Sequence, residues 1–365
     1  MNLLNKENNN YIEFDGIKNK SSQTNHYNNF NLLRLFAALQ VVYSHSISHL
    51  EIKNEYLIAF SDFISYFPGV PIFFLISGYL ISMSYDKNPN IKEYTKNRVL
   101  RIIPGLYVNF LIGLIVLWYF DQFSDISLVS ILPWIVSQLT LFQFYNPEFI
   151  RDFGVGVING SLWTISVELV FYMILPFIYV FLKKDFYRRF IVLMIISLFF
   201  YFFITNISTK TFIYEKLIGV SILPYLFYFL IGLYVYKYKD TLIKYLENKV
   251  ILYAFLYAFI VFLSVDNFAY LVLKQFVYAL FIFSFVFSYK KLSYTLMKHN
   301  DFTYGIYIYH MLVVNIFIQL GYMGGVENLF LALLLSIICG IMSYFFVEKP
   351  FLKLKKKSLF NEINK

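Results

Sequence analysis

The 365-residue sequence is poor in charged residues and nearly free of cysteine. Only 15% of its residues are Asp, Glu, Lys or Arg, whereas 59% are hydrophobic. A soluble domain of this size cannot bury so much apolar surface in a single core. The one cysteine, Cys339, lies within an apolar run, and a single thiol excludes an intramolecular disulfide. The first 29 residues also lack the apolar core of a cleavable signal peptide.

Long apolar stretches take the place of a polar surface. They are roughly 20 residues long, which is the length that crosses the ~30 Å hydrocarbon layer of a bilayer. Eleven stretches lie at about 30–50, 66–85, 102–120, 128–146, 161–182, 189–206, 217–236, 249–265, 267–289, 302–320 and 327–347. Transmembrane β-barrels have shorter segments of alternating hydropathy instead. The pattern therefore predicts an all-α polytopic membrane protein.

The Lys and Arg residues between these stretches predict which of them cross the membrane, because cytoplasmic segments are the basic ones. Five segments are basic and are expected in the cytoplasm: 86–101, 183–189, 237–249, 289–300 and 348–357. Three are not basic and are expected outside: 121–125, 264–267 and 321–328. The basic and non-basic segments fit one topology if 128–146 does not cross the membrane. This topology has about ten transmembrane helices and places both termini in the cytoplasm. If 128–146 did cross, most later basic segments would face outward.

These assignments divide the chain into three parts. Residues 1–29, rich in Asn, Lys and Ser, are expected to form a disordered cytoplasmic tail. The transmembrane domain is expected over 30–350, and 351–365 is expected to be a basic cytoplasmic tail. Within the domain, 121–160 is expected to be an external insert with a re-entrant or interfacial segment, whose Trp134 suits the membrane rim. The formal charge of +9 fits cytoplasmic loops beside membrane lipids, not nucleic acid.

The first stretch, NLLRLFAALQVVYSHSISHL, carries Arg34, His45 and His49. Ionisable residues inside a membrane are costly and are therefore candidates for function. Eleven residues at roughly 100° each return to the same helix face, so Arg34 and His45 point the same way, about 16 Å apart. Arg34 is expected near the cytoplasmic mouth and His45 in the outer half. His45 fits either a general base or a histidine bonded to a neighbouring helix. His49 follows without the HExxH pattern, so we expect an interfacial polar residue and no metal site.

Two further segments carry charges at positions that suggest a site. Arg98 and Arg101 share one helix face in RVLR, where they fit either a membrane anchor or a grip on phosphate groups. Glu168 lies in NGSLWTISVELVFYMILPF, about 10 Å below the outer surface. It fits either a partner that orients His45 and shares its proton, or a structural carboxylate. Tyr172 is expected within hydrogen-bonding reach of Glu168, and Trp163 at the outer interface.

Four less specific residues complete the candidates. Ser77 and Gly78 in PGVPIFFLISGYLIS are expected to pack helices, because the glycine two residues before a nucleophile-elbow serine is missing. His310 in FTYGIYIYHMLVV is expected about 12 Å into a helix that starts inside, on the cytoplasmic half. Glu348 in FVEKPF is expected to be an interfacial charge at the inner surface.

Taken in order, these segments resemble the integral-membrane acyltransferase 3 family, which O-acylates bacterial surface carbohydrates. The resemblance runs from about residue 30 to 352 and rests on NLLRLFAALQVVYSHS, GVPIFFLISGYLIS, RVLRIIPGLY, GSLWTISVELVFYMILP, FTYGIYIYH and VEKPF. Pro71 stands where an acidic or polar residue is common, and Thr164 replaces the usual Ser. Neither departure removes a charged motif residue. Many relatives carry an extra hydrolase-like domain, and we expect this chain to be the stand-alone form.

The resemblance implies an acyl-CoA donor, usually acetyl-CoA, and an acceptor hydroxyl on a surface carbohydrate such as lipopolysaccharide O-antigen or capsule. It places the enzyme in the bacterial cytoplasmic (inner) membrane, with no bound cofactor. The roles it implies are catalysis at His45 and Glu168, acyl-CoA binding at Arg34, Arg98 and Arg101, and support from Trp163, Tyr172, His310 and Ser77. For His310 a core histidine and a donor contact both remain open. The main alternative is a transporter of an anionic solute or lipid-linked glycan, although no internal repeat is visible. A membrane scaffold is a third reading.

Overall fold

A computed structural model describes residues 29–124, 126–209, 211–265, 267–289, 292–297 and 300–354. Within these residues the chain forms helices and no strand, which confirms the all-α class. The predicted tails lie outside the described residues, except for Asn29 and 351–354. Asn29 is buried, and 351–354 continue the last helix to Leu354.

The apolar stretches form the helices of the bundle, and each of the eleven overlaps at least one helix. The α-helices are α1 Phe30–His49, α2 Glu55–Ser65, α3 Gly69–Lys87, α4 Ile91–Tyr119, α5 Leu128–Leu139, α6 Trp163–Lys183, α7 Phe186–Phe202, α8 Ile213–Gly219, α9 Leu226–Lys237, α10 Lys239–Leu246, α11 Val250–Leu263, α12 Phe268–Phe287, α13 Leu292–Met297, α14 Thr303–Gln319 and α15 Val326–Ser343. The short segments are 3-10 turns η1 Glu148–Ile150 and η2 Gly160–Leu162, and π-helical η3 Phe203–Ile207 and η4 Tyr344–Glu348.

Six helical segments among the described residues are long and apolar enough to cross a membrane. They are Glu55–Lys87, Ile91–Tyr119, Gly160–Lys183, Phe186–Asn206, Phe268–Phe287 and Val326–Leu354. The pair α10 and α11, bent by 78°, brings the number to seven if it is one span. The apolar helices α5 and α9 have 12 residues each, and α14 has 17. The structure thus supports a multi-pass membrane protein, whereas ten spans and cytoplasmic termini stay predictions.

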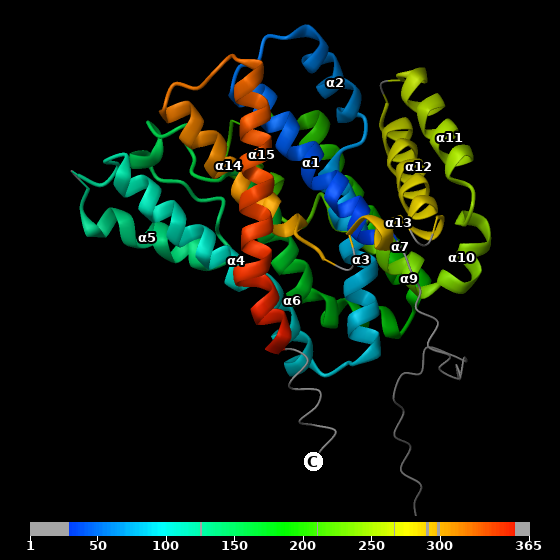
Figure 1. Ribbon diagram of the computed structural model, residues 1–365. Helices are drawn as coiled ribbons and strands as arrows, with labels where there is room; N and C mark the ends of the chain where they lie inside the picture. The colour runs from blue at the N-terminus through cyan, green and yellow to red at the C-terminus, as the bar shows by residue number, and fades with distance from the viewer. Residues whose placement is uncertain are drawn as a thin grey trace, which may run out of the picture.

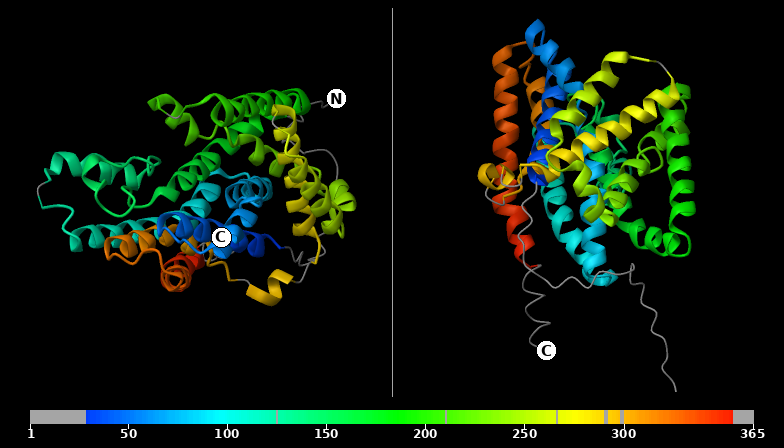
Figure 2. Two further views of the ribbon diagram at one scale, coloured as in Figure 1. Left: turned by 90° about the horizontal axis from the view of Figure 1, so that it is seen from above. Right: turned by 90° about the vertical axis from the view of Figure 1, so that its right-hand side faces the viewer.

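Helix α1 lies at the centre of the bundle (Figure 1). It packs against α3 on one side and against α14 and α15 on the other. Helix α3 also packs against α6 and α9, and α14 also packs against α4. The pair α4 and α5 extends from one edge of the molecule and the pair α11 and α12 from the opposite edge (Figures 1 and 2). As a result, α1, α3, α4, α6 and α14 surround one central region.

Glycines allow a close crossing between α3 and α9. A Cβ atom on Gly78 would lie 2.1 Å from the carbonyl oxygen of Phe229. A Cβ atom on Gly232 would lie 2.2 Å from the carbonyl oxygen of Leu75. Each glycine therefore lets the opposite backbone come close, as small residues do in membrane helices. The packing prediction for Gly78 is confirmed.

The insert at 121–160 folds against α14. The side-chain amide of Asn315 donates to the carbonyl oxygens of Val157 (2.8 Å) and Ile158 (2.9 Å). Its Oδ1 atom accepts from the backbone N–H of Val155 at 3.0 Å. Trp134 of the insert is fully buried, and its ring lies 5.5 Å from that of Phe110 on α4 and 5.7 Å from that of Phe149. Its position at the membrane rim stays a prediction.

Candidate active site

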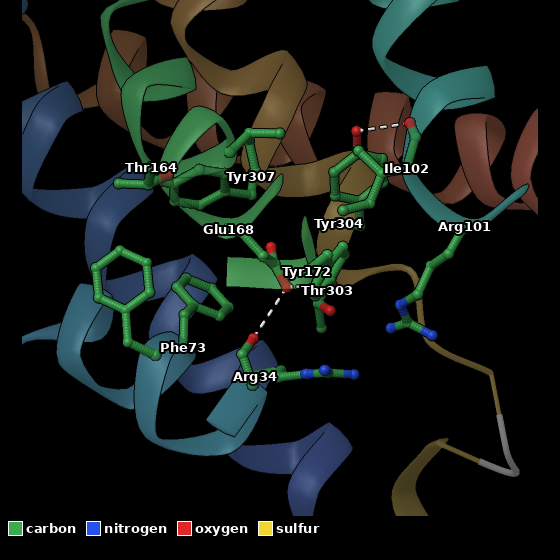
Figure 3. A pocket seen from close by; sticks show the side chains of 13 residues that line it. Arg34, Phe73, Arg101, Ile102, Thr164, Glu168, Tyr172, Thr303, Tyr304 and Tyr307 are labelled. Atoms are coloured by element: carbon green, nitrogen blue, oxygen red, sulfur yellow. Dashed lines mark hydrogen bonds between the residues drawn. The ribbon is translucent and has the colours of Figure 1, made fainter. Parts of the chain in front are cut away.

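A cavity lies where α1, α3, α4, α6 and α14 meet (Figure 3). Five of the predicted site residues line it: Arg34, Ser77, Arg101, Glu168 and Tyr172. They come from four helices that are far apart in the sequence. The helical bundle therefore brings motif residues of α1, α3, α4 and α6 to one place.

Two arginines meet a shared carboxylate at one end of this cavity. Nη1 of Arg34 lies 3.3 Å and Nη2 of Arg101 lies 2.6 Å from Oδ2 of Asp301. Burial by itself would raise the pKa of the Asp301 carboxyl, but the charges of Arg101 and Arg34 outweigh burial and lower the pKa to about 2. Asp301 is therefore ionised at neutral pH, and the cluster of three groups keeps one net positive charge.

Asp301 belongs to none of the sequence motifs that predict the site. It directly precedes the apolar stretch at 302–320, at the end of a junction that is otherwise basic. A single acidic residue in a basic junction indicates an ion pair, because the charged residues around it are all positive.

Arg98 points away from this cluster. Its Nη2 atom donates to the hydroxyl of Ser84 at 2.8 Å, and its guanidinium lies over the rings of Tyr172 and Tyr94, 5.5 and 5.9 Å from their centroids. The structure thus brings together Arg34 and Arg101, while Arg98 contacts the cavity only through the ring of Tyr172. Its role in donor binding stays a prediction.

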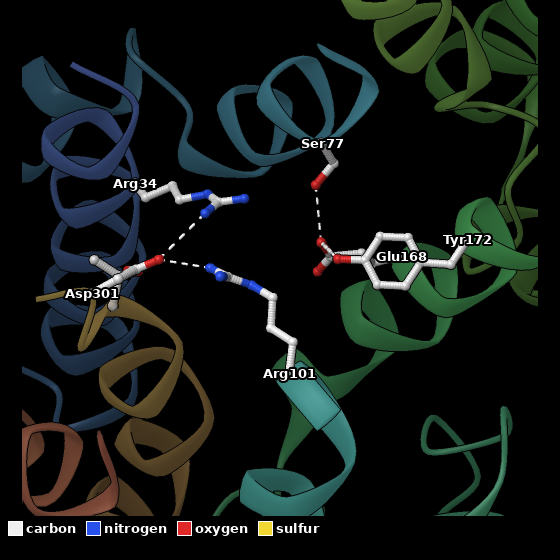
Figure 4. A network of polar contacts seen from close by, with 7 residues as sticks. Arg34, Ser77, Arg101, Glu168, Tyr172 and Asp301 are labelled. Carbon is white, nitrogen blue, oxygen red and sulfur yellow. Dashed lines mark hydrogen bonds and ion pairs between the residues drawn. The ribbon is translucent and has the colours of Figure 1, made fainter. Parts of the chain in front are cut away.

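Glu168 faces the two arginines across the cavity (Figure 4). Its Oε1 atom accepts hydrogen bonds from the hydroxyls of Ser77 (2.9 Å) and Tyr172. The predicted bond to Tyr172 is confirmed, and Ser77 does more than pack helices. The expectation that Glu168 orients His45 does not fit this geometry, because the carboxylate belongs to the arginine cavity and the imidazole has another partner.

That partner is His310, on α14. Nδ1 of His45 lies 3.0 Å from Nε2 of His310, and the two ring centroids are 5.2 Å apart. The second nitrogen of His310, Nδ1, lies 2.6 Å from the carbonyl oxygen of Tyr307. Since the two histidines touch, they share one depth in the bundle. The expectation that His310 lies in a different half from His45 is therefore wrong.

The Tyr307 side chain lies between the cavity and this histidine pair. Its hydroxyl is 2.8 Å from the hydroxyl of Thr164, and its ring centroid is 5.7 Å from that of His310. Trp163 precedes Thr164 but packs outside the cavity, 5.2 Å from the ring of Tyr225. Thr164, which departs from the family pattern, thus keeps a hydroxyl in the contact.

Two remaining candidates lie beside the site. The ring of His49 is 5.7 Å from that of His45, and no group of three or more His, Cys, Asp or Glu residues in the described ranges is placed to hold a metal ion. Glu348 is only 4% exposed and accepts from the hydroxyl of Ser343 at 3.0 Å. Glu348 is therefore a buried carboxylate in η4, and the expectation of an interfacial charge is wrong.

Comparison with known families agrees with the motifs. A family model described as an acyltransferase domain matches residues 27–347. The chain belongs to the acyltransferase 3 family. The resemblance drawn from six sequence motifs is confirmed, and the protein is a membrane-embedded acyltransferase. No solved structure shows significant similarity to this acyltransferase.

Three curated relatives are similar to this acyltransferase over different lengths. Nodulation protein 10 of Rhizobium leguminosarum bv. viciae is 29% identical over 361 residues, 90% of this chain and 94% of that protein. The O-acetyl transferase of Shigella phage Sf6 is 30% identical over 175 residues, 46% of this chain and 50% of that one. Peptidoglycan O-acetyltransferase OatA of Listeria monocytogenes is 32% identical over 126 residues, 32% of this chain and 20% of that protein.

Proposed function

We propose that this acyltransferase moves an acetyl group from cytoplasmic acyl-CoA to a hydroxyl of a bacterial surface polysaccharide such as O-antigen or capsule, in the cytoplasmic (inner) membrane. Two relatives named as O-acetyl transferases support oxygen as the acceptor atom. The observation that carries the proposal is the arrangement along α1. Arg34 contributes to the cationic cluster at one end of the cavity, and His45, on the same face, contributes to a histidine pair beyond the cavity.

The donor end of the proposal rests on the charge of the cavity. Within the cluster at one end of the cavity, Arg34 and Arg101 outnumber their shared partner Asp301, so this end offers a positive charge to an anionic ligand. Guanidinium groups bind phosphate through paired hydrogen bonds, and CoA is a polyphosphate. We assign Glu168 to this donor side, because its carboxylate faces the arginines from the opposite wall of the cavity. The thioester would then extend toward Thr164 and Tyr307.

The acceptor end of the proposal rests on His45. The imidazole takes the proton of the acceptor hydroxyl, and the oxygen attacks the thioester carbonyl carbon. The carbon–sulfur bond breaks, and the CoA thiolate receives the proton from the imidazolium. The products are the O-acyl ester and CoA. General-base assistance of this kind contributes roughly 10²–10⁴-fold to a rate.

The test compares variants in a strain that lacks the chromosomal gene. Mass spectrometry of the surface glycan should show O-acetylation with the wild type, almost none with His45→Ala, and a reduced level with Arg101→Ala that recovers at higher acyl-CoA supply. His49→Gln serves as the matched control and should retain the wild-type level, because it keeps a polar group beside His45.

Two results would contradict the proposal. Unchanged O-acetylation in His45→Ala would remove the general base from the mechanism. Loss of glycan export with no change in O-acetylation would favour a transporter for an anionic solute or lipid-linked glycan.

A further inference from the structure

The proton positions in the histidine pair follow from the partner at its far end. Nδ1 of His310 lies 2.6 Å from the carbonyl oxygen of Tyr307, three residues earlier on α14. A carbonyl oxygen only accepts hydrogen bonds, so Nδ1 of His310 carries a proton. In a neutral imidazole the other nitrogen then has a free lone pair. Nε2 of His310 is therefore an acceptor.

The acceptor on His310 determines the tautomer of His45. Nδ1 of His45 lies 3.0 Å from Nε2 of His310, so this nitrogen of His45 must be the donor. The lone pair of His45 is then on Nε2, which has no hydrogen-bond partner among the described residues. We propose that His310 is a positioning residue that fixes His45 as the Nδ1–H tautomer and makes Nε2 the atom that takes the proton of the acceptor hydroxyl. This inference rests on the proposed function of His45.

The other proton arrangements are costly. If His310 carried its proton on Nε2, a lone pair on Nδ1 would face the lone pairs of the Tyr307 carbonyl at 2.6 Å. If both nitrogens of His310 were protonated, a cation would be buried in a side chain that is 0% exposed. An unpaired charge at such a position is strongly unfavourable in a membrane protein. The neutral chain from His45 through His310 to Tyr307 is the arrangement that satisfies every contact.

The hydrogen bond between the histidines also survives the reaction. When Nε2 of His45 takes the proton of the hydroxyl, Nδ1–H still donates to His310, and the charged form makes the stronger bond. In other enzymes a carboxylate accepts the hydrogen bond from the catalytic histidine. In a membrane this would require a buried negative charge. A neutral imidazole orients the base without placing a second ion in the membrane.

Two amide variants separate orientation from packing. In His310→Gln the amide lies near the former Nε2 position and its oxygen accepts from His45. In His310→Asn the amide lies near the former Nδ1 position and cannot reach His45. With purified enzyme, acetyl-CoA and an acceptor glycan, we expect kcat of His310→Gln to stay within about tenfold of wild type. For His310→Asn we expect a loss of roughly 10²-fold or more, with little change in the KM for acetyl-CoA.

A spectroscopic measurement reads the tautomer directly. In protein with ¹⁵N-labelled histidine rings, the His45 signals should report a proton on Nδ1 and a free lone pair on Nε2. In His310→Asn they should report a mixture of tautomers, and in His310→Gln they should resemble wild type. The wild-type spectrum needs no variant, so the proposal stays testable even if one substitution prevents folding.

Failure of this inference is distinct from failure of the proposed function. A proton on Nε2 of His45 in the wild type overturns it. Equal losses in both amide variants with an unchanged His45 tautomer overturn it as well, because His310 then acts by packing alone. If His45→Ala keeps its activity, the proposed function fails, whatever tautomer His45 adopts.

Discussion

At the scale of single residues, Asp301 joins two arginines that come from different helices, so this contact depends on its charge. Removing one partner of this partly buried ion cluster leaves the other charges uncompensated. The cost is up to about 3 kcal/mol, the lower end of the range for fully buried pairs. We therefore expect Asp301→Asn to lower the melting temperature of the detergent-solubilised protein. CoA should raise that temperature more in the variant than in wild type, because its phosphates replace the missing negative charge.

The control for this prediction is Glu148→Gln. Glu148 pairs with Arg151 at 4.0 Å on the surface of the insert, and its side chain is 96% exposed. Exposed pairs of this kind contribute between 0 and about 1 kcal/mol. Its melting temperature and its response to CoA should match wild type. An Asp301→Asn protein that is as stable as wild type, with no larger response to CoA, would show that Asp301 does not hold the arginines.

The sequence predicted the residues of the site better than their partners. Arg34 and His45 lie on one helix, so the helical period was enough to place them on one face. Their partners Asp301 and His310 are 267 and 265 residues further along the chain. Contacts over such separations depend on how helices cross, and no local pattern contains that information. For the same reason the sequence predicts the bond of Glu168 to Tyr172 on its own helix but not its bond to Ser77 on α3.

At the scale of helices, the crossing of α3 and α9 determines where Ser77 meets Glu168. A methyl group on Gly78 would overlap the backbone of Phe229, which cannot move as a side chain can. Overpacking usually costs about 1–3 kcal/mol. We expect Gly78→Ala to lower the unfolding midpoint in a denaturing detergent and to reduce acyl transfer, because α3 shifts and separates Ser77 from its carboxylate.

Gly219→Ala is the matched control, since the nearest atom to the new methyl group would lie 4.0 Å away. This variant should unfold at the wild-type midpoint or slightly above it, because alanine favours helix over glycine. Equal effects of the two substitutions would mean that the α3–α9 crossing tolerates a wider separation.

Hydropathy predicts where helices form, but it does not predict where they break. Every apolar stretch contains at least one helix, because backbone groups in lipid must bond within their own segment. The stretch at 217–236 nevertheless divides into α8 and α9, and α10 meets α11 at 78°. The π-helical turn that buries Glu348 was also unpredicted. Such features depend on packing between helices, which composition alone does not determine.

At the scale of the whole molecule, the fold connects the two ends of the proposed reaction through α1. One turn of this helix reaches the arginine cavity together with α4, and another reaches the histidine pair together with α14. Tyr307 separates the two places in the structure. The proposed mechanism therefore takes the thioester past this ring, in a direction that depends on which side of the membrane each end faces.

The orientation can be tested at two exposed positions on either side of α6. Helix α5 has 12 residues, or about 18 Å, which is too short for a ~30 Å hydrocarbon layer. If α5 does not cross, residue 148 in the insert faces outward and residue 184 in the basic junction faces the cytoplasm. In a Cys339→Ser background, a membrane-impermeant maleimide should label Glu148→Cys in intact cells and Lys184→Cys only after permeabilisation. A crossing α5 would exchange these two results, with labelling of both in denatured protein as the control for reactivity.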